Sequence, residues 1–133
     1  MTNLTAYLST LTVFVLCDMV WLGTMASRFY RPTLGDVLLT NVNLTAGVAF
    51  YLIYPVGLVI FAVLPALKSG GLTHAALYGG LFGFFTYLTY DLTNQATLRN
   101  LTTQLTVLDA GWGTLLGAIA ATAGFWVTAK FAA

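Results

Sequence analysis

Four long windows with almost no charged side chains set the strongest limit on what this chain can fold into. They lie at about Leu4–Met25, Leu44–Leu67, Thr73–Leu98 and Thr103–Thr128. A helix needs about 20 apolar residues to cross roughly 30 Å of hydrocarbon, and each window is long enough. Only 7% of the residues are charged, whereas an ordinary soluble domain has about 25%. The sequence therefore predicts an integral membrane protein, with the lipid bilayer as its main partner.

The expected fold is an all-α membrane protein, a single domain over residues 1–133 with four transmembrane helices in a bundle. Four crossings place both termini on the same side of the membrane. The first window lacks a basic leader and an Ala-x-Ala cleavage site, so we expect it to be retained as a span. Pro32 could open a short interfacial helix that reaches Leu39, and Pro55 predicts a kink in the second span. Lys and Arg are too evenly divided between the two sides to predict the orientation.

Charge and composition exclude several function classes. The net charge is +1 and no basic run is present, so we expect no nucleic-acid partner. Cys17 stands alone and His74 is the single histidine, so the spacing of a metal site is missing. No cofactor is indicated. The sequence also lacks the Ser-His or Cys-His pair of a nucleophilic enzyme, so an enzyme is the less favoured class.

Three aspartates fall inside the predicted spans at similar depth. Asp18 lies roughly 10–12 Å from the end of the first window, Asp91 roughly 10 Å from the end of the third, and Asp109 roughly 8–9 Å from the start of the fourth. All three depths are measured from the same membrane face. A charge in the bilayer core costs roughly 2.5–3.5 kcal/mol on the insertion scale, so this convergence needs a reason.

Helical spacing groups further polar and aromatic residues with these carboxylates. Tyr87, Asp91, Asn94 and Gln95 form one stripe on the third helix. The pair Asp18 and Trp21 on the first helix is repeated as Asp109 and Trp112 on the fourth, and we expect these tryptophans to pack or to line a cavity wall. The second helix contributes Tyr51 and Tyr54. Three arginines are expected at the mouth of this region: Arg28, Arg31 and Arg99.

Two interpretations of this region remain open. The aspartates could join helices through hydrogen bonds, or they could surround a polar half-cavity that binds a cation, a proton or a polar ligand. We favour the second interpretation. Carboxylates this close would hold at least one proton, and Asp91 and Asp109 are the expected pair to share it.

Small residues recur at four-residue spacing in the last two windows. Gly79 and Gly83 form one such face, and Gly113 and Gly117 form another. Such faces serve tight helix packing within a bundle or a homodimer interface.

Several blocks of the sequence resemble one bacterial family. They are Cys-Asp-Met-Val-Trp-Leu-Gly at 17–23, Phe-Tyr-Arg-Pro-Thr-Leu-Gly at 29–35, Phe-Tyr-Leu-Ile-Tyr at 50–54, Thr-Tyr-Asp-Leu-Thr-Asn-Gln-Ala-Thr-Leu at 89–98 and Asp-Ala-Gly-Trp-Gly-Thr at 109–114. Together they are similar to the membrane family labelled domain of unknown function 2177. The resemblance implies a four-helix protein of prokaryotic inner membranes. It implies no reaction and no catalytic residues.

Three functions remain as hypotheses. The favoured one is binding or transport of a small polar or amphiphilic ligand, coupled to a proton and carried out by an oligomer. The alternatives are an accessory subunit with purely structural polar groups and a lipid-modifying enzyme with an Asp as general base.

Overall fold

The fold consists of helices joined by short connections. The computed structural model describes residues 2–25, 28, 32, 44–98 and 101–131. Its helices are α1 (Thr2–Met25), α3 (Leu44–Leu58), the π-helix η3 (Val59–Val63), α4 (Leu64–Lys68), α5 (Gly71–Thr97) and α6 (Thr103–Phe131). Because α3, η3 and α4 follow one another without a break, they make one long rod. The expected interfacial helix after Pro32 lies outside the described residues.

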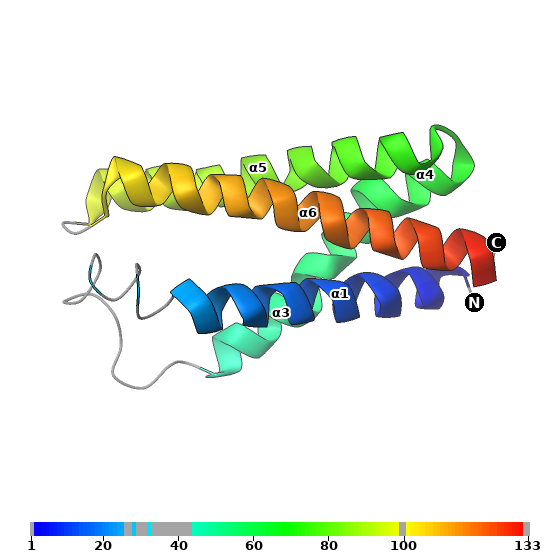
Figure 1. Ribbon diagram of the computed structural model, residues 1–133, viewed down its shortest axis with the longest axis horizontal. Helices are drawn as coiled ribbons and strands as arrows, with labels where there is room; N and C mark the ends of the chain where they lie inside the picture. Colours follow the sequence, from blue (N-terminus) through cyan, green and yellow to red (C-terminus); the bar gives the residue numbers. More distant parts are fainter. Residues whose placement is uncertain (1, 26–27, 29–31, 33–43, 99–100, 132–133) are drawn as a thin grey trace.

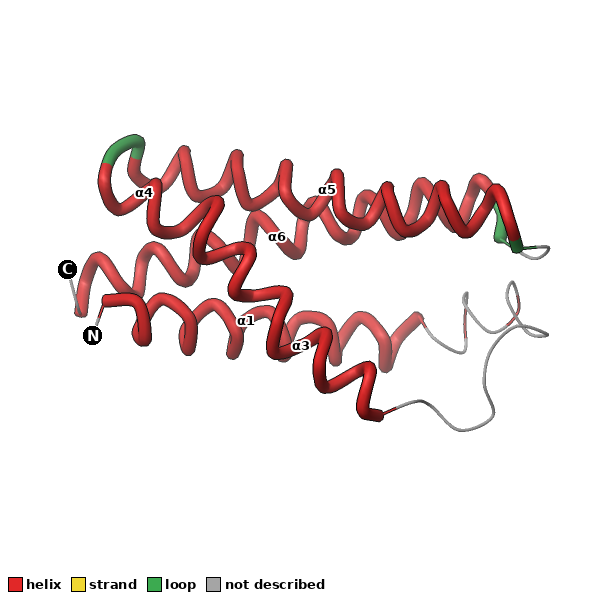
Figure 2. The backbone as a smooth tube through the Cα atoms, turned by 180° about the vertical axis from the view of Figure 1, so that it is seen from behind, coloured by secondary structure: helices red, strands yellow, loops and turns green. Residues whose placement is uncertain are grey.

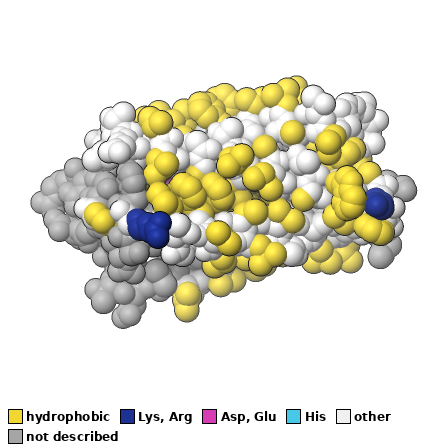
Figure 3. All heavy atoms as spheres, viewed as in Figure 1, with side chains coloured by type: hydrophobic (Ala, Val, Ile, Leu, Met, Phe, Trp, Pro, Cys, Tyr) yellow, Lys and Arg dark blue, Asp and Glu magenta, His cyan; other side chains and the backbone are white. Residues whose placement is uncertain are grey.

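The surface of the helices fits a lipid environment. Three helical segments are long and apolar enough to cross a membrane, namely Thr2–Met25, Leu44–Lys68 and Thr103–Phe131. Many large apolar side chains point outward, among them Leu16, Val20, Ile53, Phe85 and Val107. On the face drawn in Figure 3, hydrophobic side chains cover the middle of the molecule, and Lys and Arg atoms lie toward its ends. The expectation of membrane-spanning helices is confirmed for these three segments.

The helix α5 is the one whose expected crossing rests on length alone. It has 27 residues, about 40 Å at 1.5 Å per residue, which exceeds the thickness of the hydrocarbon core. The polar residues between Thr86 and Gln95 dilute its apolar character. Its passage through the membrane is therefore treated below as a proposal.

The helices α5 and α6 pack side by side as an antiparallel pair along much of their length, and α1 lies against α6 (Figure 1). The rod from α3 to α4 crosses obliquely behind them (Figure 2). The N-terminal end of α1 and the C-terminal end of α6 lie at the same end of the bundle. Toward the opposite end, the ribbons of α1 and α6 diverge, and that is where the polar residues of interest are found.

Glycine faces explain why α5 and α6 approach so closely. A Cβ atom on Gly83 would lie 1.9 Å from the carbonyl oxygen of Gly113, and one on Gly117 would lie 2.2 Å from that of Gly79. Backbones in such contact exclude any side chain and favour Cα–H···O contacts. Of the two uses predicted for these faces, the structure shows packing inside one chain. The glycine faces are buried there, so a homodimer through them would require α5 and α6 to separate.

The irregular turn of the long rod lies after Pro55 rather than at it. The helix continues through Pro55, and the π-helical turn at Val59–Val63 follows. Its last hydrogen bond runs from the Leu64 N–H to the Val59 carbonyl. Pro65 has no N–H to continue a regular α-helix, so the wider turn directly before it accommodates the missing donor.

Candidate functional site: a buried carboxylate region

Asp18 is a buried carboxylate that accepts hydrogen bonds from two other helices. It is 6% exposed and continues the buried face of α1 that contains Ala6, Thr10 and Phe14. The hydroxyl of Tyr51 on α3 donates to its Oδ2, and the indole Nε1 of Trp112 on α6 donates to its Oδ1 at 3.1 Å. Both oxygens are therefore satisfied, and Asp18 joins α1 to α3 and α6.

The two tryptophans of the repeated Asp-x-x-Trp pattern stack on each other. The ring centroids of Trp21 and Trp112 are 4.4 Å apart, with an interplanar angle of 5°. This stack joins α1 and α6 in the half of the bundle where their ribbons diverge. The tryptophans thus bridge the two helices there, while Trp112 also orients Asp18.

Asp91 and Asp109 form a second carboxyl group site, between α5 and α6. Asp91 is 2% exposed, and a side-chain hydrogen bond joins it to Asp109. The Oδ2 atom of Asp91 is buried and has no hydrogen-bond partner among the described residues. A buried carboxyl oxygen without a partner is costly, so this atom marks the place where a proton, a water molecule or a ligand would gain most.

Tyrosines lie beside both carboxyl sites. The Tyr54 hydroxyl is 2.8 Å from the Thr86 Oγ1, and its ring stacks on Phe14 with a centroid distance of 5.0 Å. Tyr87 packs directly over Gly113, where an added Cβ would lie 2.3 Å from the ring. Its ring lies edge-on to that of Tyr54, with centroids 6.1 Å apart. Glycine at position 113 is therefore what gives Tyr87 its place between the helices.

Gln95 joins the ends of α5 and α6 nearest these sites. Its Nε2 donates to the Thr103 hydroxyl at 2.8 Å, and its Oε1 accepts from the Thr106 hydroxyl at 2.7 Å. Asn94 is half-buried beside it, and its carbonyl accepts the Leu98 N–H at the end of α5. Both amides of the predicted stripe thus lie at this end of the bundle.

Among the three predicted mouth residues, Arg28 is exposed. Arg31 and Arg99 lie outside the described residues. Among the described residues, no group of three His, Cys, Asp or Glu side chains comes close enough to hold a metal ion.

Three threonines of the site were not singled out from the sequence. Thr86 bonds Tyr54, and Thr103 and Thr106 bond Gln95. Spacing could have indicated Thr106, because it lies three residues before Asp109 on the same helix. Nothing in the sequence distinguishes Thr86 from the other threonines of α5, such as Thr89 and Thr93, whose hydroxyls bond carbonyls of their own helix.

The arrangement combines membrane-competent helices with carboxyl, phenol and indole groups gathered inside one end of a bundle. It defines the class of the chain as a helical membrane protein with buried ionisable residues. The family described as predicted membrane protein (DUF2177) matches residues 3–126. The chain belongs to this family, as its sequence blocks indicated. No curated protein and no solved structure matches the chain.

Proposed function

We propose that the chain is a four-span protein of a prokaryotic inner membrane that binds a small polar or amphiphilic ligand at Asp91 and Asp109, with a proton exchanged on binding. The observation that carries the proposal is the Asp91 carboxyl group, which is 2% exposed and keeps one oxygen without a partner among the described residues. A group buried at such cost is typical of functional sites inside membranes.

The fourth span follows from the packing of α5. This helix lies antiparallel to α6 and in glycine contact with it at both Gly79 and Gly83. Because α6 is long and apolar enough to cross the membrane, a helix packed along it occupies the same depth. The polar residues of α5 that face α6, such as Asp91 and Gln95, are then shielded from lipid by that helix.

Proton exchange is supported by the contact between the two carboxyl groups. An ionised carboxylate can only accept hydrogen bonds, so the hydrogen bond between Asp91 and Asp109 requires a proton on one of them. A cationic or hydrogen-bond-donating ligand that reached the unpartnered Asp91 oxygen would favour loss of that proton. Binding and proton release would then be linked, as in carboxylate sites of transporters.

A second candidate function is a structural subunit, and the Asp18 network favours it. Asp18 has both oxygens satisfied by Tyr51 and Trp112, so it joins three helices without needing a ligand. If Asp91 and Asp109 do no more than this, the polar residues only fix helix geometry. A lipid-modifying enzyme has no comparable support, because no nucleophile has been found beside the carboxyl groups.

Native mass spectrometry of the detergent-purified full chain tests the binding proposal. We expect a co-purified species on the wild type that is lost in Asp91→Asn and in Asp109→Asn. Thr89→Val is the matched control on α5, because Thr89 is exposed and its hydroxyl bonds the Phe85 carbonyl within its own helix. Near-ultraviolet circular dichroism on each variant checks that the bundle remains folded.

The outcomes separate the two candidates. A bound species kept by Thr89→Val and lost in both Asp variants supports the ligand site. A bare mass for the wild type and all variants, with lower thermal stability in the Asp variants, contradicts it and leaves the structural subunit as the better explanation.

A further inference from the structure

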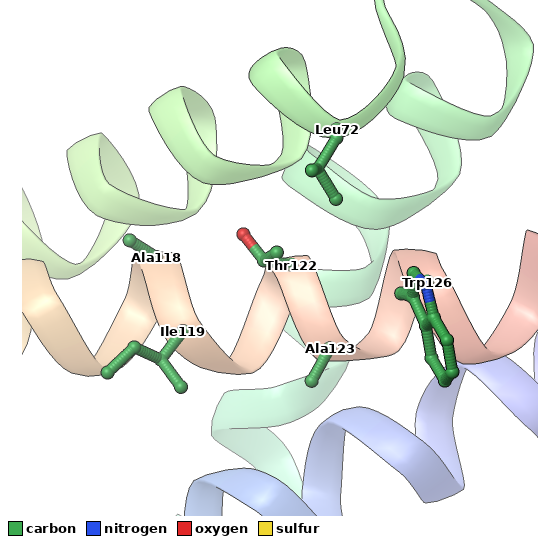
Figure 4. A pocket seen from close by; sticks show the side chains of 6 residues that line it. All are labelled: Leu72, Ala118, Ile119, Thr122, Ala123 and Trp126. Atoms are coloured by element: carbon green, nitrogen blue, oxygen red, sulfur yellow. The ribbon is translucent and has the colours of Figure 1, made fainter.

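An apolar groove runs along α6 at the end of the bundle opposite to the carboxyl groups. Its volume is about 510 Å³, and it is lined by Leu72 of α5 and by Ala118, Ile119, Thr122, Ala123 and Trp126 of α6. Figure 4 shows Leu72 on one side of it and the small side chains of Ala118 and Ala123 along the α6 surface. The small residues leave room that a larger side chain would fill.

The dimensions of the groove match one leaflet of a bilayer. From Ala118 to Trp126, α6 rises about 12 Å at 1.5 Å per residue, close to half of the roughly 30 Å hydrocarbon core. Trp126 is 52% exposed, as expected for an aromatic residue at the membrane interface. The groove therefore has the depth and the apolar lining that suit a lipid acyl chain.

A cation stands at the outer end of the groove. The Lys130 ammonium lies 4.7 Å from the centroid of the Trp126 ring, and it is one helical turn further along α6, at head-group level. Lys68 is exposed in the last turn of α4 at the same end of the bundle. The described aspartates all lie toward the opposite end, so the local charge at this end is positive.

We propose that this groove binds one anionic phospholipid, with an acyl chain along Ala118–Trp126 and the head-group phosphate on the Lys130 ammonium. A juxtamembrane lysine attracts anionic lipids, and its three N–H donors can bond a phosphate while the ring of Trp126 supports the side-chain stem. This site is separate from the carboxyl region, and the proposal does not depend on the function proposed for that region.

Quenching of Trp126 fluorescence by brominated lipids tests the proposal. The full chain is reconstituted in phosphatidylcholine vesicles that contain a minor fraction of brominated phosphatidylglycerol or, in parallel, of brominated phosphatidylcholine. The difference between wild type and Trp126→Phe isolates the Trp126 signal from those of Trp21 and Trp112. We expect brominated phosphatidylglycerol to quench Trp126 more strongly than brominated phosphatidylcholine at equal content.

Two pairs of variants locate the site. Lys130→Gln should weaken the apparent affinity for phosphatidylglycerol about fivefold, whereas Lys130→Arg and Lys68→Gln should retain most of it. Ala123→Leu should fill the groove and remove the preference, whereas Leu at the exposed Ala96 of α5 should not. Lys130 is exposed, so its replacement tests the charge without disturbing the core.

Other results would overturn the proposal. Equal quenching by the two brominated lipids would show that the groove has no preference for an anionic head group. A preference unchanged in Lys130→Gln would place the head group elsewhere. If neither lipid quenches and Thr122→Cys in a Cys17→Ser background forms a disulfide dimer, the occupant is a second copy of the chain.

Discussion

At the scale of single residues, two buried aspartates differ in how their oxygens are satisfied. Asp18 accepts from an indole and a phenol, and neither donor is itself acidic at neutral pH. Asp91 is bonded to another carboxyl group and keeps one oxygen without a partner among the described residues. We infer that Asp18 serves mainly to join helices, while Asp91 is the residue suited to exchange a proton or bind a ligand.

The role of Asp18 predicts a stability effect at Tyr51. Tyr51→Phe removes the hydroxyl that donates to Asp18 and leaves the ring contact with Phe14 in place. We expect the free energy of unfolding to fall by about 1–2 kcal/mol, the range for a hydrogen bond between membrane helices. Unfolding in mixed micelles with increasing sodium dodecyl sulfate would measure it.

A tyrosine at the far end of the bundle provides the control. Tyr78→Phe leaves the stacking of that ring on His74, and the exposed position predicts a change near zero. If both substitutions cost the same, the Asp18 hydrogen bond contributes nothing particular to stability.

The contact between Asp91 and Asp109 predicts a protonated carboxyl group in the membrane. Infrared difference spectra of wild type against Asp91→Asn should show the C=O stretch of a protonated carboxyl at neutral pH, and Asp109→Asn should abolish the same band. Asp18→Asn should leave it in place. A spectrum in which every carboxyl group is ionised at pH 7 would refute the shared proton.

At the scale of elements, the α5–α6 pair is held by backbone contact at glycines. Gly83 faces the Gly113 carbonyl oxygen, and Gly79 faces Gly117. Inside a bilayer, burying apolar side chains away from water gives no advantage, so close packing of small residues becomes the main attraction between helices. The same contact positions Tyr87 and Asp91 on α5 opposite Asp109 on α6, because all three lie further along the two helices that the glycines join.

Two Gly→Ala substitutions separate helix packing from helix propensity. In Gly83→Ala the new Cβ would lie 1.9 Å from a backbone oxygen, which no rotamer change can relieve, so we expect a loss of about 1–3 kcal/mol in the free energy of unfolding. Gly111→Ala meets nothing within 4 Å and should be neutral or gain up to about 1 kcal/mol. Thermal unfolding in one detergent compares them, and similar losses for the two variants would contradict the packing argument.

At the scale of the whole molecule, charged and polar groups are divided between the two ends. Asp18, Asp91 and Asp109 lie toward the end where α1 finishes and α6 begins, while Lys68 and Lys130 lie at the end that holds the start of α1. The middle of the face in Figure 3 is covered by hydrophobic side chains. This distribution is what a bundle that crosses a bilayer requires, with each proposed site reached from a different face of the membrane.

Cysteine labelling tests whether α5 crosses the membrane. In a Cys17→Ser background, Ser69→Cys lies in the turn before α5 and Thr102→Cys lies just after it, and both positions are exposed. We expect a membrane-impermeant maleimide to reach these two cysteines from opposite sides of oriented vesicles. Labelling of both from the same side would show that α5 does not span.

Much of the fold could be derived from the sequence, since lipid leaves few alternatives to the α-helix for a long apolar segment. The helices begin and end close to the windows that the sequence defines, and the family follows from its residue blocks. The sequence also identified Asp18, Asp91 and Asp109 as the buried acids to explain, because an ionisable residue inside an apolar window is rare and costly.

Tertiary structure alone decided which groups meet. Helical spacing gives the face of a residue but not the partner across the interface, so it could not show that Trp112 bonds Asp18 or that Thr86 bonds Tyr54. It also left open whether the glycine faces join helices of one chain or of two. That choice depends on how the loops and the crossing of the α3–α4 rod bring the helices together, which is a property of the whole chain and not of any one window.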